Sequence, residues 1–163
     1  MKKLFLLFFS ITLLVGCTQD NTKWYNTKED AIKNGLEEES SNAILLSVEE
    51  YSGETIVFFE LKEALGVASI IESKKGFSWY RGQPFIGFDD DGSTFSTMGF
   101  NIETHQGTNI SIVAGKAYDE SIKQIKILGD GKEKEVPITE KSRLFYAFHG
   151  VSFTSLKIIP IVD

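Results

Sequence analysis

Around Ile32 the apolar positions repeat with the period of an α-helix. Ile32 and Leu36 are four positions apart, a spacing that places both side chains on one face of an α-helix. Thr27 can cap the first turn, and Asp30 at the third helical position imitates a capping box. The acidic run Glu37–Glu39 opposes the helix dipole, so the helix should end close to it. We therefore expect one short amphipathic helix.

From Asn42 onward the pattern changes to short segments rich in β-branched and aromatic residues, separated by turn sequences. Gly129-Asp130-Gly131 is a strong hairpin signal. Pro160 predicts an edge position for the last strand, because proline cannot donate to a sheet ladder. The predicted strands are Ala43–Glu50, Thr55–Lys62, Val67–Ser73, Phe77–Arg81, Phe85–Phe88, Phe95–Thr104, Asn109–Ala117, Ile122–Leu128, Lys134–Ile138, Arg143–Phe148 and Leu156–Val162.

This order predicts a mainly β fold that is α+β on its N-terminal side. A short helix on an antiparallel meander, residues 24–91, should be followed by a β-sandwich-type half, residues 94–163. The aspartate-rich turn between them is the best candidate boundary. We expect the helix to pack on the meander. In the second half one core should contain Ile125, Ile127, Phe145 or Tyr146, and Ile158 or Ile159.

Residues 110–163 resemble part of a bacterial Ig-like domain. The resemblance implies two packed antiparallel sheets, and it covers about a third of the chain. It rests on a strand that ends in glycine, a small-acidic turn, an alternating strand, a short Val-Pro-Ile strand, an aromatic strand and a final apolar strand. These are Ile112-Val113-Ala114-Gly115, Tyr118-Asp119, Ile122 with Ile125 and Ile127, Val136-Pro137-Ile138, Phe145 with Tyr146 and Phe148, and residues 158–163.

The first residues of the chain have the three zones of an export signal. Lys2 and Lys3 form a positive start, Leu4–Val15 is an apolar run, and Gly16 and Cys17 close it. A membrane-spanning helix needs about 20 apolar residues, so this run is too short for a comfortable permanent span.

Leu14-Val15-Gly16-Cys17 closely resembles the lipobox of bacterial lipoproteins. The resemblance implies that residues 1–16 are a signal peptide removed before Cys17, and that the Cys17 thiol carries a diacylglyceryl group. Residues 17–23 then form a lipidated cysteine and a polar tether. An ordinary secretory signal with a chance cysteine is the alternative. A lipoprotein would lie on the extracytoplasmic face of the cell membrane, held there by lipid on Cys17.

Charge limits the partners that such a protein can have. The whole chain has a net charge of −6, and removal of residues 1–16 takes away two lysines and no acidic residue, which leaves about −8. This balance argues against nucleic acid, whose binding surfaces are basic. An envelope protein or a cell-wall component remains as the expected partner. Few alanines and many Lys, Ile, Phe and Asn residues favour an AT-rich, Gram-positive host.

Metal and catalytic signatures are weak. Asp89 and Asp91 lie in an acidic turn that could offer oxygen ligands to calcium, but the EF-hand register fails and an acidic solvated turn explains it. His105 and His149, the only histidines, have no zinc-binding spacing and should lie on the surface or a rim. No nucleophile elbow or phosphate loop occurs. We therefore expect no enzyme and no cofactor; a metal-dependent or hydrolytic envelope protein that uses Asp89–Asp91 and a histidine is the alternative.

The best candidate binding surface is aromatic. Trp79, Tyr80, Arg81 and Phe85 are close in sequence, and Trp, Tyr and Arg are enriched at binding hot spots. Strand alternation places Trp79 and Arg81 on one face and Tyr80 on the other. The competing interpretation is that Trp79 is a core residue. Trp24-Tyr25 should pack the incoming chain against the domain. A non-catalytic binding module is the function that these features favour.

Overall fold

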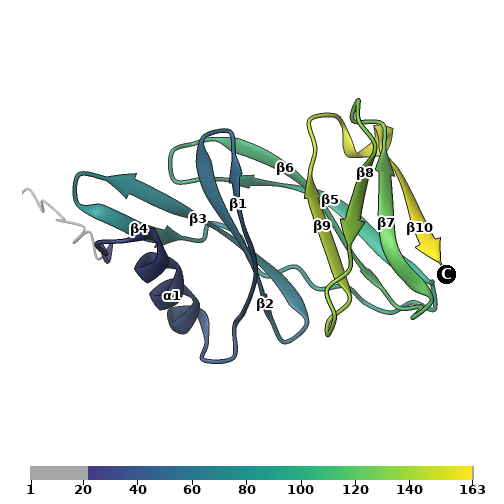
Figure 1. Ribbon diagram of the computed structural model, residues 1–163, viewed down its shortest axis with the longest axis horizontal. Helices are drawn as coiled ribbons and strands as arrows, with labels where there is room; N and C mark the ends of the chain where they lie inside the picture. Colours follow the sequence, from purple (N-terminus) through teal and green to yellow (C-terminus); the bar gives the residue numbers. More distant parts are fainter. Residues whose placement is uncertain (1–21, 163) are drawn as a thin grey trace, which may run out of the picture.

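The computed structural model describes residues 22–162 and is mainly β, with one short α-helix followed by antiparallel sheets (Figure 1). This confirms the predicted fold class. The lipobox and Cys17 lie outside the described residues. The elements are α1 (Lys28–Glu39), β1 (Ile44–Tyr51), β2 (Glu54–Leu61), β3 (Ala64–Ser73), β4 (Gly76–Tyr80), β5 (Phe95–Glu103), β6 (Asn109–Ala117), β7 (Ile122–Leu128), β8 (Lys134–Pro137), β9 (Leu144–Phe148), a 3-10 turn (Phe153–Ser155) and β10 (Lys157–Val162).

The strands form three antiparallel sheets. The first sheet has the order β1-β2-β3-β4, the second β5-β6-β9 and the third β10-β7-β8. In Figure 1 the helix and the first sheet lie at one end of the molecule, and β7, β8 and β10 lie at the other. β10 is an edge strand, as Pro160 predicted.

Two cores hold the three sheets together, and strand alternation explains both. Ile110, Ile112 and Ala114 of β6 pack against buried residues of the first sheet such as Phe58. Val113 and its neighbours on the opposite face of β6 pack against the third sheet. The second sheet is therefore the middle layer. The predicted core is confirmed with Ile125, Ile127 and Phe145 buried and Ile158 packed against them.

The helix covers the other face of the first sheet. Thr27 caps it as predicted, because its hydroxyl oxygen accepts from the Asp30 backbone N–H at 3.0 Å. Ala31 and Ile32 are buried against Val57 and Ile70. The first sheet is thus buried on both faces, which explains why β2 is buried along nearly its whole length.

One predicted strand is absent. Phe85–Phe88 is not a strand, because only Ile86 pairs, through two hydrogen bonds with the backbone of Leu65. The reason is the register of β4, which pairs only with Ser69–Ser73 and so leaves a short length of the β3 edge for Ile86 to cover. The first core also takes residues from both sides of the predicted boundary, such as Phe58 and Ile110. The boundary near residues 89–93 stays a prediction.

Candidate functional site

An open apolar surface lies where α1 leaves the first sheet uncovered. A helix is about 10–12 Å wide, whereas four strands about 4.8 Å apart span more than that. α1 packs on β3 and β4, at one side of the sheet. Leu45 and Val48 of β1 therefore remain 44% and 42% exposed. These are high values for large apolar side chains next to a core.

Leu45 and Val48 form one wall of an apolar groove, and Ile32 and Leu36 of α1 form the other. The groove has a volume of about 450 Å³. Its rim is charged, with Lys33 among the charged residues and Lys28 paired with Glu50 at 2.8 Å. Hydrogen bonds from Lys28 and Thr55 hold the pKa of the Glu50 carboxyl below its usual range.

A second hollow lies on the opposite face of the same strand. It has a volume of about 270 Å³ and is lined by Leu46, Ser47 and Glu49 of β1, by residues 136–139 and by Tyr146. The Tyr146 hydroxyl donates to the Ser47 oxygen at 3.1 Å, and Ser47 donates to the Glu49 carboxylate at 3.0 Å. Burial raises the pKa of the Tyr146 hydroxyl.

The outer edge of β1 pairs with no other strand of residues 22–162. The edges of β4 and β10 are protected. Tyr25 pairs with Phe77 of β4 through two backbone hydrogen bonds of 2.8 Å, and β10 contains Pro160. β1 has eight residues and no proline. It therefore presents free backbone donors and acceptors between two hollows.

The predicted aromatic surface has a different character. Trp79 Nε1 and Arg81 Nε both donate to Glu39 at the end of α1, at 3.2 and 2.7 Å. The Arg81 guanidinium lies 4.6 Å from the Phe85 ring centroid, and the Phe59 ring makes edge contacts with Trp79 and Phe85. Trp79, Arg81 and Phe85 are thus brought together, and their partners are α1 and β2 of the same molecule.

Tyr80 lies on the other face of β4, as strand alternation predicted. Its ring meets His105 edge-on at 5.4 Å, and both line a hollow of about 300 Å³ beside the incoming chain. Tyr25 also lines this hollow and donates to Glu38 at 3.1 Å. Lys75 lies 5.6 Å from the Trp24 ring centroid. Trp24 and Tyr25 therefore pack the incoming chain against the domain.

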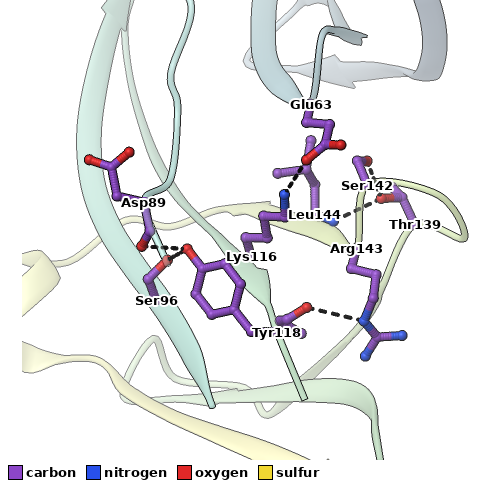
Figure 2. A network of polar contacts seen from close by, with 10 residues as sticks. Glu63, Asp89, Ser96, Lys116, Tyr118, Thr139, Ser142, Arg143 and Leu144 are labelled. Atoms are coloured by element: carbon purple, nitrogen blue, oxygen red, sulfur yellow. Dashed lines mark hydrogen bonds and ion pairs between the residues drawn. The ribbon is translucent and has the colours of Figure 1, made fainter. Parts of the chain in front are cut away.

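Asp89 and Asp91 lie in an exposed turn. The Asp91 carboxylate accepts from the Ser93 backbone N–H at 3.0 Å, and hydrogen bonds from the Ser93 hydroxyl and backbone lower the Asp91 pKa. Figure 2 shows Asp89 beside Ser96 and Tyr118, whose hydroxyl donates to the Asp89 carbonyl oxygen at 2.7 Å. These contacts shape the turn. Within residues 22–162, no three His, Cys, Asp or Glu side chains gather as a metal site would require.

His149 was expected at the surface or a rim, and this prediction is wrong, because the residue is only 5% exposed. Its backbone N–H donates to Ser111 and so continues the pairing of β9 with β6. The ring Nδ1 lies 2.8 Å from the Val151 carbonyl oxygen, and Nε2 is buried without a hydrogen-bond partner among residues 22–162. His105, by contrast, is exposed as predicted.

Sequence reasoning missed the β1 site. Strict alternation puts Leu45 and Val48 on opposite faces of the strand. The register shift between Leu45 and Ser47 brings both side chains to the helix side, and the sequence pattern does not reveal it. The available signal was quantitative: one helix of about three turns cannot cover a four-stranded sheet. Which strand stays uncovered depends on where Trp79 and Glu39 fix the helix.

Comparisons with models of protein families, with curated proteins and with solved structures gave no match. Across residues 22–162, no helix is long and apolar enough to cross a membrane.

Proposed function

We propose that this chain is an extracytoplasmic lipoprotein, anchored by lipid on Cys17, that works as a non-catalytic binding module near the cell membrane. The anchoring part rests on the charged, apolar and lipobox zones of residues 2–17. The binding part rests on one observation above all. The unpaired edge of β1 lies between an apolar groove and a mixed hollow.

The anchor and the folded part of the chain would be close to each other. Cys17 precedes Thr22, the first described residue, by five positions, and five residues span at most about 18 Å. The folded part would then stay near the lipid headgroups. Its net charge of about −8 favours lipid over electrostatic attachment, since anionic lipid repels it. The partner is accordingly an envelope protein or a cell-wall component.

The anchor is tested by replacing Cys17 with Ser. The wild type should incorporate labelled palmitate and enter the detergent phase of Triton X-114. The Cys17→Ser variant should carry no label, and it should be released from the membrane fraction or accumulate as uncut precursor. An unlabelled wild type that stays in the aqueous phase refutes the lipoprotein proposal.

The binding function is tested in intact cells with a photo-crosslinking residue at Leu45. We expect adducts that the same residue at Met98, which is also exposed, does not give. If neither position gives an adduct, the binding proposal fails. A metal-dependent or hydrolytic protein built on Asp89–Asp91 and a histidine is the alternative, and metal binding can test it directly.

A further inference from the structure

The two hollows flank one strand edge, and this arrangement fits an extended chain better than any other ligand. A strand added to β1 would continue the sheet, and its successive side chains would point to opposite faces. Those on one face would enter the groove next to Leu45 and Val48. Those on the other would enter the hollow next to Ser47 and Glu49.

We propose that β1 binds an extended segment of another protein as a fifth strand of the first sheet. The inference rests on the proposed binding function and names the class of partner for that same surface. Backbone hydrogen bonds along the open edge supply affinity, and the two hollows select alternate side chains. The register shift between Leu45 and Ser47 marks where a bound strand must adjust its pairing.

The charges on β1 specify the segment further. The strand begins with Ile44, Leu45 and Leu46 and ends with Glu49 and Glu50 before Tyr51. Glu50 is already bound by Lys28 and Thr55. Glu49 is exposed, and within residues 22–162 its carboxylate accepts a hydrogen bond from Ser47 alone. A matching segment has apolar side chains at one end and Lys or Arg at the end beside Glu49.

The same polarity disfavours a second copy of this chain. If β1 paired with itself in an antiparallel way about its middle, Glu49 and Glu50 of each copy would lie opposite the Ile44–Leu46 end of the other. The exposed Glu49 carboxylate would then be covered by apolar side chains without a cationic partner, which is costly. A different segment that is apolar at one end and basic at the other avoids this cost.

The test uses the full chain in phosphatidylcholine nanodiscs and a phage-displayed library of random peptides about as long as β1, which has eight residues. Selected peptides should have apolar residues at alternate positions, with Lys or Arg at one end. Leu45→Glu and Val48→Glu should each weaken binding at least about tenfold. Met98→Glu and Val162→Glu, at exposed apolar sites elsewhere, should leave it unchanged.

Backbone pairing is tested by N-methylation of a selected peptide. Methyl groups on the amides that face β1 should abolish binding, and methyl groups on the alternate amides should leave it within about twofold, because only one edge of an added strand is bonded. The proposal would be overturned if both series of methylated peptides bound equally well. It would also be overturned if the apolar residues of the selected peptides had a helical spacing.

The remaining outcomes separate this inference from the function on which it rests. Peptides that still bind Leu45→Glu would place binding elsewhere, which refutes the strand addition but leaves a binding module. A dimer in sedimentation that Leu45→Glu dissociates would replace the partner segment with a second copy. No enriched peptide, together with no photo-crosslinked adduct at Leu45, would refute both.

Discussion

Gly35 and Trp79 fix the position of the helix on the first sheet. The Trp79 ring packs directly on Gly35, so closely that a Cβ at this position would overlap the ring. Glu39, one turn further along α1, accepts from both Trp79 and Arg81. These contacts hold α1 over β3 and β4 and so leave Leu45 and Val48 open.

Gly35→Ala should therefore lower the free energy of unfolding by up to about 2 kcal/mol. Overpacking costs about 1–3 kcal/mol, and this exceeds the gain of about 1 kcal/mol that alanine brings to a helix. Urea denaturation followed by tryptophan fluorescence measures the change. Gly87→Ala is the control, because a Cβ there meets no atom within 4 Å. A Gly35→Ala variant more stable than the wild type would contradict the packing argument.

The acidic turn at Asp89–Asp91 gives a second prediction at the residue scale. Because the Asp91 carboxylate is engaged by Ser93, we expect millimolar calcium to leave the melting temperature of the purified protein unchanged. A ligand at 100 times its Kd would add about 2.7 kcal/mol, which a thermal melt detects. A clear rise that disappears in Asp89→Asn and Asp91→Asn would favour the metal-dependent alternative.

At the level of elements, alternation and glycine-containing turns predicted most strand positions, whereas contacts distant in sequence determined the exceptions. Asn109–Ala117 and Ile122–Leu128 were predicted with their observed bounds. β3 begins at Ala64 instead of Val67, because Lys62 and Glu63 form a two-residue turn without the residues typical of one. The open edge of β1 likewise depends on where α1 packs, which no local pattern reveals.

The Lys62-Glu63 turn is strained, and this strain can be relieved. Both residues have positive φ, 51° and 63°, a conformation that costs most side chains about 1–2 kcal/mol. Asparagine tolerates it better, so Lys62→Asn should raise the free energy of unfolding by about 0.5–1 kcal/mol. The exposed pair of Glu63 with Lys116, seen in Figure 2, is untouched by this change.

Lys74→Asn provides the matched control for this turn, because Lys74 is an exposed lysine in another hairpin and does not have a positive φ. Its free energy of unfolding should stay within about 0.5 kcal/mol of the wild type. Chemical denaturation of the two variants in parallel makes the comparison. Equal effects of the two substitutions would show that the backbone conformation at Lys62 carries no cost.

At the level of the whole molecule, β6 couples the three sheets. Ile112 belongs to the core shared with the first sheet, and its neighbour Val113 belongs to the core shared with the third. Both are fully buried. A disturbance of either core must therefore move a strand that the other core needs, so the described part of the chain should unfold as one cooperative unit.

Ile125→Ala tests this coupling, because Ile125 is fully buried in the core of the third sheet. The substitution should cost about 2–5 kcal/mol.

Both tryptophans, Trp24 and Trp79, belong to the part that contacts the first sheet, so their fluorescence reports the far end of the molecule. In urea, fluorescence and far-UV circular dichroism should give the same unfolding midpoint. Ile125→Ala should lower the midpoint equally by both measurements. Val162→Ala, at an exposed site on the same sheet, should hardly change it. A fluorescence midpoint that stays at the wild-type value while circular dichroism gains an earlier transition would mean that the two halves fold separately. The β1 edge could then be studied in the first half alone.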